Sequence, residues 1–409
     1  MRQICASIRC FLIAGAVTSI LALAAAAQTE SILYSFTGGN DGSGPQGGLT
    51  PDGKGNYFGA ASGGGSDNAG VVFELSPNSS GGWSEHVIYS FTGYSNLSDG
   101  ARPSGALVFD SKGNLYGVTG GGGVSGSAGG AGTVFELTPR SNGTWTEKIL
   151  YSFAGGTDAW GPYDQGLSID STGNLYGTSY LGGAYGYGAV YELVAGAGGA
   201  WTEKVLYSFK GLNDGASPFA SPLVLDSAGN LYGADPQGGA HDYGVVYELS
   251  PGSGGVWIQK VLYSFPAGAG GESPLGALTF DSAGNLYGTA GYVAFELIHG
   301  STGKWTPKIL HRFVGGADGA NPLAGMVFDK AGNLYGVTST GGAHRGVVYE
   351  LSPTASGTWT EKILHRFASN GTDGSAPVYS NVTVDASGNL FGTAGGGTSG
   401  QGVIFEIKP

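Results

Sequence analysis

The sequence predicts an all-β protein, a seven-bladed β-propeller with four strands in each blade, and three observations lead to this prediction. A block of about fifty residues recurs seven times along the chain. Each copy has four short runs of strand-forming residues and no sustained apolar period of 3.6 residues, so helices should be scarce. The chain also begins with the motif that ends every other copy, which predicts a closed ring.

Each copy opens with an apolar run, such as residues 106–109, that predicts a first strand buried on both faces. An Asp-x-x-Gly-Asn segment follows and predicts a tight turn, because Gly tolerates a positive φ and Asp and Asn bond nearby backbone. The turn asparagines mark the seven copies at Asn56, Asn114, Asn174, Asn230, Asn285, Asn333 and Asn389.

The second strand reads Leu-Tyr-Gly-Thr, and a glycine-rich loop separates it from a third strand with a central glutamate. The fourth strand starts at a tryptophan in six copies and ends in a Leu-Tyr-Ser-Phe block. A further copy of that block stands alone at residues 32–36. We therefore expect residues 30–36 to pair beside residues 402–407 and to complete a seventh blade built from residues 375–409.

The tandem Asp-x-x-Gly-Asn-Leu-Tyr-Gly, Val-Tyr-Glu-Leu and Leu-Tyr-Ser-Phe blocks resemble the GloVer repeats of secreted "choice-of-anchor" proteins. The resemblance covers nearly all of the chain after residue 27. More distantly, the Asp-x-x-Gly-Asn-Leu-Tyr block resembles NHL-type propeller repeats. The resemblance implies no activity. Members of the GloVer family commonly end in an anchoring signal, whereas this chain ends at Pro409 directly after a predicted strand, so such an anchor is not expected.

Residues 1–27 are predicted to be a cleaved secretory signal peptide. Arg2 and Arg9 precede an apolar run of about 16 residues, too short for an ordinary membrane span, and an Ala-x-Ala site ends the segment. A membrane anchor is the alternative interpretation. Cys5 and Cys10 both lie in this segment, so the mature domain, residues 28–409, would contain no disulfide and no cysteine ligand.

The composition excludes several classes of protein. The chain has 81 glycines, but it also has 22 Tyr, 18 Phe and 7 Trp, which argues against disorder, and it lacks the Gly-X-Y period of collagen. The net charge of -12 argues against nucleic acid or an anionic membrane as a partner. No stretch after residue 27 is apolar enough to span a bilayer. We expect a secreted monomer, extracellular or periplasmic.

Comparison of the copies separates repeated residues, which serve every blade, from residues that break the pattern. The strand glutamates and turn aspartates recur and are assigned to structure, the former through cross-strand lysines. The acids of the inter-blade loops, which connect one blade to the next, are assigned to turns, with a structural Ca²⁺ at one loop as the alternative. These acids are Asp41, Asp99, Asp158, Asp214, Glu272, Asp318 and Asp373.

The histidines predict no metal site. His311 and His365 replace tyrosine in the Leu-Tyr-Ser-Phe block and should lie in strands. His241 and His344 lie in glycine-rich loops two blades apart, too far for a shared metal that needs three or four converging ligands.

The densest break in the pattern lies in the third and fourth copies, where aromatic side chains stand beside a histidine and carboxylates. This combination suits a sugar ring, which stacks on aromatic faces and hydrogen-bonds through its hydroxyls. Loop tyrosines that merely fill space between glycines are the alternative. The candidate ligand-binding residues are Trp160, Tyr180, Tyr185, Tyr187, His241, Asp242 and Tyr243, with Tyr163 and Asp164 nearby.

Three classes of function remain open at this point. The favoured one is an extracellular binding module for a glycan or a cell-surface polymer. The second is a propeller lyase, glycosidase or lactonase that uses Asp235, His241 or Asp242 as acid or base, although the chain shows no established catalytic motif. The third is a structural protein of a surface layer or matrix. Fold alone does not choose among them.

Overall fold

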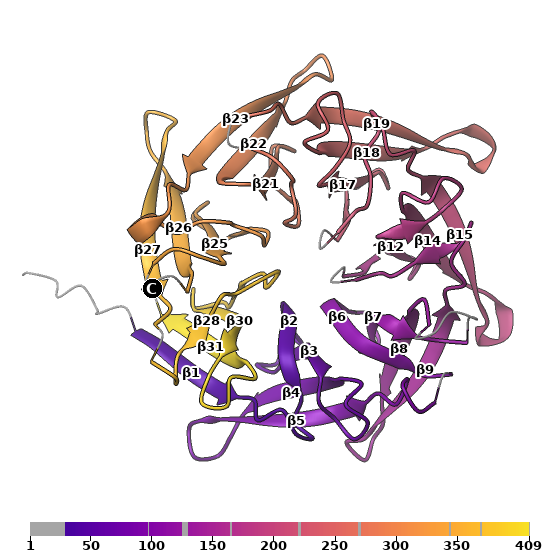
Figure 1. Cartoon of the computed structure of the whole chain (residues 1–409), viewed down its shortest axis with the longest axis vertical. Helices are drawn as coiled ribbons and strands as arrows, with labels where there is room; N and C mark the ends of the chain where they lie inside the picture. Colours follow the sequence, from indigo (N-terminus) through magenta and orange to yellow (C-terminus); the bar gives the residue numbers. More distant parts are fainter. Residues whose placement is uncertain are drawn as a thin grey trace, which may run out of the picture.

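The computed structural model describes residues 29–96, 98–124, 130–163, 166–219, 222–268, 271–342, 345–368 and 370–408. Seven antiparallel sheets stand around a central axis, and the first strand of each lies nearest that axis (Figure 1). The seven-bladed propeller predicted from the repeats is therefore confirmed. The predicted signal peptide, residues 1–27, lies outside the described residues.

The first three blades follow one another along the chain, each with four strands ordered from the axis outward. Blade 3 carries an additional two-stranded pair, β10 with β13, on its loops. The strands are β2 (Ser43–Pro51), β3 (Tyr57–Gly63), β4 (Val71–Pro77) and β5 (Trp83–Ser90) in blade 1; β6 (Gly100–Phe109), β7 (Leu115–Gly122), β8 (Thr133–Pro139) and β9 (Trp145–Ser152) in blade 2; and β10 (Ala159–Trp160), β11 (Ser168–Ile169), β12 (Leu175–Ser179), β13 (Leu181–Gly182), β14 (Ala189–Ala195) and β15 (Trp201–Ser208) in blade 3.

The remaining blades keep the same order, and blade 7 takes its fourth strand from the start of the chain. Their strands are β16 (Val224–Leu225), β17 (Leu231–Asp235), β18 (Val245–Pro251) and β19 (Trp257–Ser264) in blade 4; β20 (Thr279–Phe280), β21 (Leu286–Ala290), β22 (Val293–His299) and β23 (Trp305–Arg312) in blade 5; β24 (Val327–Phe328), β25 (Leu334–Thr338), β26 (Val347–Pro353) and β27 (Trp359–Arg366) in blade 6; and β28 (Gly374–Ser375), β29 (Thr383–Val384), β30 (Leu390–Gly396), β31 (Val403–Lys408) and β1 (Thr29–Ser35) in blade 7.

Helical structure is confined to three single turns within the described part of the chain. These 3-10 helices are η1 (Ala197–Gly199), η2 (Ser253–Gly255) and η3 (Gly316–Asp318). None of the described helices could cross a bilayer. The scarcity of helices agrees with the missing 3.6-residue period in the sequence.

The ring closes through β1, which pairs antiparallel with β31. Thr29 lies opposite Lys408 and Ser35 opposite Val403, with a β-bulge near Ile32. The Phe36 N–H extends the pairing by donating to the Gly402 carbonyl at 2.9 Å. The edge of the last blade is thereby covered, as the spare N-terminal motif predicts.

The repeated acids have the structural roles expected of them. In all seven turns the aspartate accepts hydrogen bonds from the backbone N–H and the side-chain amide of the asparagine four residues later, as Asp170 does from Asn174 at 2.9 and 3.0 Å. Five of the seven strand glutamates lie opposite lysine on the fourth strand, and Glu296 approaches Lys308 at 3.3 Å. Glu74 lies opposite His86 and Glu406 opposite Ser31.

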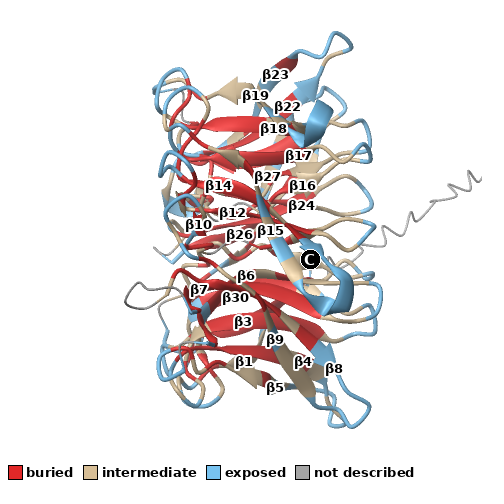
Figure 2. Cartoon of the chain, turned by 90° about the vertical axis from the view of Figure 1, so that its right-hand side faces the viewer, coloured by how far each residue is buried: buried red, intermediate tan, exposed pale blue. Residues whose placement is uncertain are grey.

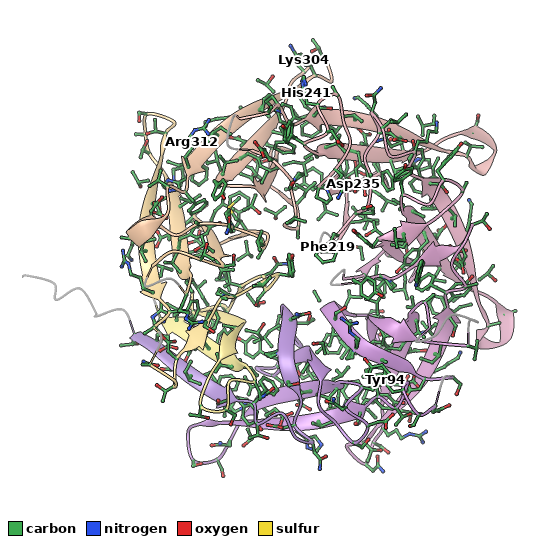
Figure 3. All side chains as sticks on the ribbon, in the orientation of Figure 1. Tyr94, Phe219, Asp235, His241, Lys304 and Arg312 are labelled. Atoms are coloured by element: carbon green, nitrogen blue, oxygen red, sulfur yellow. The ribbon has the colours of Figure 1, made fainter. Side chains whose placement is uncertain are left out.

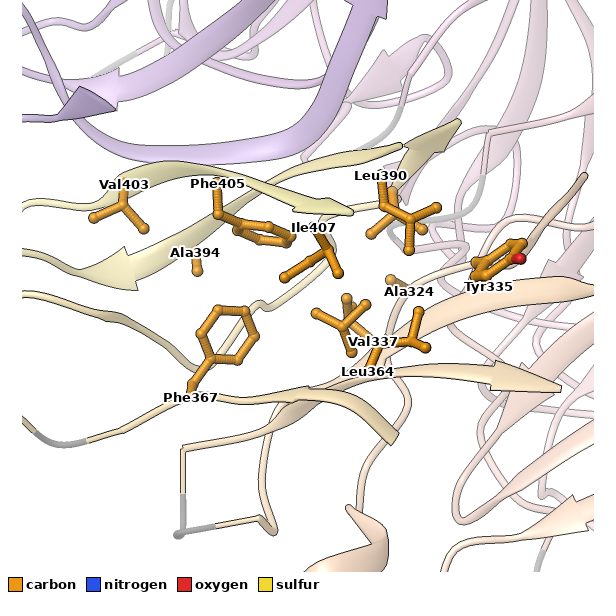
Figure 4. Packing of buried hydrophobic residues seen from close by; sticks show 12 residues of the cluster. Ala324, Tyr335, Val337, Leu364, Phe367, Leu390, Ala394, Val403, Phe405 and Ile407 are labelled. Carbon is orange, nitrogen blue, oxygen red and sulfur yellow. The ribbon is translucent and has the colours of Figure 1, made fainter. Parts of the chain in front are cut away.

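The hydrophobic core is divided among the joints between blades. The described buried side chains form seven clusters, each combining residues of two neighbouring blades. Figure 4 shows the cluster between blades 6 and 7, where Phe367 and Leu364 face Phe405, Leu390 and Ile407. The blades therefore have no separate cores, and each depends on both of its neighbours.

One aromatic contact recurs at all seven joints. The phenylalanine that follows each fourth strand meets the aromatic residue of the next blade's third strand, with ring centroids 4.8–5.3 Å apart and the rings steeply inclined. That second ring stands over the glycine of the neighbouring Leu-Tyr-Gly strand, where an added Cβ would come within 2.3–2.8 Å of it. This contact explains why the glycine recurs in every copy.

A second joint links the loops of adjacent blades. The residue before the loop proline has a positive φ in every blade, between 43° at Ala376 and 67° at Gly161. In six of the seven blades its N–H donates to a carbonyl of the preceding blade, as Ser217 does to Tyr187 at 2.7 Å. In the same six blades the proline packs on a glycine: a Cβ at Gly188 would lie 2.7 Å from Pro218. The Asp-Gly-x-x-Pro pattern is therefore a turn that also locks neighbouring blades together.

Deletion of residues 29–36 should expose the β31 edge and remove one aromatic joint, causing aggregation or a large loss of thermal stability. Size-exclusion chromatography with light scattering and thermal melting would measure both effects. A synthetic peptide of residues 29–36 added in trans should restore a monomeric, more stable species. A truncated chain that stays monomeric with an unchanged melting temperature would contradict closure by β1.

The Tyr349→Phe variant should have a free energy of unfolding that is higher by about 1 kcal/mol. The Tyr349 hydroxyl is fully buried without a hydrogen-bond partner, and the equivalent residue in four other blades is phenylalanine, so the variant should pack as those blades do. Denaturant unfolding would measure the change. The reverse substitution at the matching position, Phe135→Tyr, should destabilise the protein.

Candidate functional site

Two sets of loops form one face of the ring, which we call the loop face. The inter-blade loops pair with the loops between second and third strands, as Ala159 does with Gly182, Ala216 with Gln237 and Ala320 with Thr340. The tight turns and the hairpins between third and fourth strands form the opposite turn face. The two faces are the left and right edges of Figure 2, with β10 on the loop face.

Exposed aromatic side chains are found on the loop face only, within the described residues. They lie in inter-blade loops or in loops between second and third strands, whereas Val256, Ile258 and Ile298 near the turn face are aliphatic. Three of the five belong to blade 3. The set is Tyr94, Trp160, Tyr185, Tyr187 and Tyr292.

The blade 3 aromatics lie on paired and adjacent loops. Trp160 is 38% exposed, forms the β10 pair with Leu181, and lies over Gly155 of its own loop. Tyr185 and Tyr187, 56% and 47% exposed, follow in the loop between β12 and β14. The Tyr187 ring covers Gly211 of the next inter-blade loop, where a Cβ would come within 2.6 Å of the ring. Tyr187 therefore lies at the junction of blades 3 and 4, and all three side chains are partly open to solvent.

Tyr180 belongs to a different group, close to the central axis. Its ring meets Phe219 at a centroid distance of 5.8 Å, and Phe219 in turn meets Tyr379 at 5.3 Å. Phe219 lies near the centre of the ring in Figure 3. Since Tyr379 comes from the blade 7 loop, the three rings connect blades 3, 4 and 7 across the axis.

A positively charged side chain, Arg102 of blade 2, also lies on the loop face. The exposed Arg102 guanidinium sits 5.8 Å from the centroid of the Tyr163 ring, which itself rests against Gly120 and Gly161. A guanidinium over an aromatic face gains a modest electrostatic attraction and remains able to bind an anionic group.

The fourth-blade candidates have less access to a ligand than the sequence suggested. Asp242 has a φ of 61° and accepts a hydrogen bond from the Gly238 N–H at 3.0 Å, as Asn68 does from Gly64 in blade 1. Tyr243 is partly buried and packs against the core between blades 4 and 5. His241 is exposed on the same loop. His344 and Asp164 lie outside the described residues.

Asp235 ends β17 and has no exposed surface. Burial, with Asp214 nearby, raises the pKa of its carboxyl well above the usual range, and neither oxygen has a hydrogen-bond partner. Equivalent positions hold Thr119, Ser179 and Thr338, whose hydroxyls bond the adjacent loop. Asp235 therefore occupies a structural position that a ligand does not reach.

The inter-blade loop acids are held by the fourth strand of the preceding blade. Asp41, for example, accepts from the Tyr34 hydroxyl at 3.0 Å and from the Thr37 N–H at 2.7 Å. The same tyrosine bond recurs at Asp99, Asp158 and Asp214, and histidine replaces the tyrosine at Asp318 and Asp373. Glu272 differs, since it accepts from the Gly268 N–H within its own loop.

A glutamate of the following fourth strand adds a second carboxyl to these groups. Burial, with the loop aspartate beside it, raises the pKa values of Glu85, Glu147 and Glu203 to about 7. One oxygen of each is buried without a hydrogen-bond partner. At the corresponding place in blade 4, Gln259 donates to the Asp214 carbonyl at 3.0 Å.

Comparison with known proteins supports the repeat assignment. Residues 124–308 match the Gloeobacter/Verrucomicrobia repeat family. This segment runs from blade 2 to the fourth strand of blade 5, and it confirms the resemblance found in the tandem blocks. No curated protein matches the sequence.

Solved propellers share the fold at low sequence identity. Virginiamycin B lyase from Staphylococcus aureus superposes with a TM-score of 0.56 at 15% identity, covering 93% of this chain and 99% of the lyase. A streptogramin B lyase gives 0.55 at 16% identity, covering 93% and 97%. The extracellular domain described for a hybrid two component system of B. thetaiotaomicron gives 0.58 at 12%, covering 92% and 39%. These likenesses show the propeller fold alone.

The Glu85→Gln, Glu147→Gln, Glu203→Gln triple variant should lose part of the pH dependence of stability. In the wild type, the raised folded-state pKa values mean that these groups stabilise the fold below about pH 4.5 and lose that contribution as the pH rises towards 7. Melting temperatures between pH 5 and 8 should therefore fall less steeply in the variant.

Glu192→Gln is the matched control. This glutamate accepts a hydrogen bond from the Tyr176 hydroxyl and is not part of the inter-blade carboxyl pairs. It should leave the slope of melting temperature against pH unchanged. Equal slopes for the wild type and the triple variant would contradict the assigned pKa shifts.

Proposed function

We propose that this propeller is an extracellular binding protein that holds a glycan or another cell-surface polymer on its loop face. The observation that carries the proposal is the asymmetry of the ring: every exposed aromatic side chain among the described residues lies on that face. A surface of this kind is typical of binding sites, because scattered structural aromatics would be found on both faces.

The chemistry of the blade 3 surface suits a carbohydrate. Trp160, Tyr185 and Tyr187 offer ring faces on which the C–H surface of a sugar can stack. The tyrosine hydroxyls can hydrogen-bond sugar hydroxyls, and so can His241, which is exposed on the blade 4 loop and lies towards blade 5 in Figure 3. The other candidates lie apart from these three rings: Tyr180 stacks on Phe219 near the axis, Tyr243 packs at the joint of blades 4 and 5, and Asp242 shapes the blade 4 loop.

Secretion is part of the same proposal. Residues 1–27 have the pattern of a signal peptide, and no cysteine follows Cys10. A propeller with a similar fold is described as an extracellular domain. We propose that the protein acts as a monomer, either outside the cell or in the periplasm.

A catalytic role has less support from the geometry. Acid–base catalysis needs two titratable groups within reach of a substrate. Asp235 is fully buried, Asp242 is held in its turn, and neither forms a hydrogen bond with His241 among the described residues. The binding role is therefore preferred over a lyase, glycosidase or lactonase, and over a scaffold without a ligand.

Replacing Trp160 and Tyr185 by alanine should weaken glycan binding by about 1–3 kcal/mol for each ring that stacks on a sugar, by analogy with base stacking. A glycan array with residues 28–409 would first identify a bound sugar, and calorimetry would then compare affinities. The melting temperature should barely change, because loop tips contribute little to the core.

Tyr292→Ala is the matched control, since this tyrosine is equally exposed on the same face but belongs to blade 5. It should retain affinity if the blade 3 surface is the site. Unchanged binding in all variants, or an array without any bound glycan, would favour the scaffold. Turnover of a sugar polymer that His241→Ala abolishes would favour the enzyme.

A further inference from the structure

Two of the seven joints between fourth strands contain a histidine flanked by two carboxyls. His365 on β27 lies between Asp373 of the following loop and Glu30 on β1. His311 on β23 lies between Asp318 and Glu361 on β27. In each group, one ligand atom from every residue lies within 4.8 Å of the others.

The distances fit ligands around a small ion. His311 Nε2 is 3.1 Å from Asp318 Oδ1 and 3.7 Å from Glu361 Oε1, and His365 Nε2 is 3.3 Å from Asp373 Oδ2. Zinc bound to nitrogen and oxygen at its usual bond lengths holds tetrahedral ligands about 3.4 Å apart. The 3.1 Å contact is also that of a hydrogen bond, roughly 2.7–3.2 Å, whereas the 3.3 and 3.7 Å contacts are longer than ordinary hydrogen bonds.

Comparison of the joints within the chain gives an independent argument. Blades 1 to 3 carry the same carboxyl pair with a tyrosine, as at Tyr34, Asp41 and Glu85. Where glutamine or proline replaces the glutamate, at Gln259 and Pro307, the preceding strand again has a tyrosine. At this position of the joint, histidine therefore occurs only where two carboxyls accompany it. The three side chains together form the mixed nitrogen and oxygen donor set that zinc sites use.

The ligand atoms are oriented before any ion arrives. The Asp318 Oδ2 atom accepts from the Val314 N–H at 2.6 Å, which leaves Oδ1 facing the histidine. The His311 ring packs edge-on against Phe313 at 4.8 Å, and His365 packs in the same way against Phe367. Supporting contacts of this kind fix ring and carboxylate orientation in metal sites.

Each group also contains a buried glutamate oxygen that no ordinary hydrogen bond satisfies. Glu30 Oε1 and Glu361 Oε1 are buried and accept no hydrogen bond. A divalent cation would stabilise both carboxylates as anions. The histidine side chains remain 18–20% exposed, so an ion can enter from solvent.

We propose that the Glu30–His365–Asp373 and His311–Asp318–Glu361 groups each bind a divalent transition-metal ion of the zinc type, with water completing the tetrahedral coordination. Histidine nitrogen favours zinc over Ca²⁺, which prefers six to eight oxygen ligands. Each ion would bridge neighbouring blades. The first would fasten the closing strand β1 to blade 6, and the second would join blades 5 and 6.

Calorimetric titration with ZnCl₂ of residues 28–409, previously dialysed against EDTA, would test this proposal. The wild type should bind two ions per chain and melt at a higher temperature with zinc than with EDTA. His311→Tyr and His365→Tyr should each bind one ion, and the double variant none. Tyrosine is the residue of the other five joints, so these variants should fold, as melting in EDTA would verify.

Two reciprocal variants provide the matched control. Tyr151→His places a histidine beside Asp158 and Glu203 and should create a third site, whereas Tyr207→His, where Gln259 replaces the glutamate, should not. Equal zinc stoichiometry in the wild type and the double variant would overturn the proposal. So would stabilisation by CaCl₂ alone, or the absence of any binding at millimolar zinc.

Discussion

The ring depends on a contact between an aromatic side chain and a glycine that repeats at every joint. The third-strand ring can reach the preceding blade's phenylalanine only because the adjacent strand has no Cβ beneath it, as at Gly177 under Tyr191. The glycine of the second strand leaves room for the large ring of the third strand, which packs against both its own blade and the preceding one. The same contact recurs at every joint of the ring.

Much of the fold could be predicted from the sequence because all blades make the same contacts with the same residues. The Asp170 to Asn174 turn, the strand order and the closing strand each follow from local chemistry or from counting copies. The few charged residues also recur at fixed positions of the repeat, so they supported the same assignment of strands and turns. Comparison of the seven copies therefore showed which residues every blade needs, as an alignment of related sequences would.

The site was less predictable because its contacts join copies that are distant in sequence. The ring contact between Phe219 and Tyr379 joins blades on opposite sides of the axis, and no local sequence pattern predicts it. The residue after the loop proline differs from copy to copy, and this variation could have drawn attention to Phe219. Likewise Asp242 reads as a functional exception until its backbone conformation identifies it as a turn residue. Glu30 gains its partner His365 only through ring closure.

Closure by β1 also imposes an order on biosynthesis. The first strand to leave the ribosome has its hydrogen-bonding partner at the opposite end of the chain, since Thr29 pairs with Lys408. Contacts of such long sequence separation form late in folding. The other six blades can form before β1 pairs, and the ring closes only after the last strand of the chain has been synthesised. Incomplete chains would keep two unpaired strands and remain open to proteolysis.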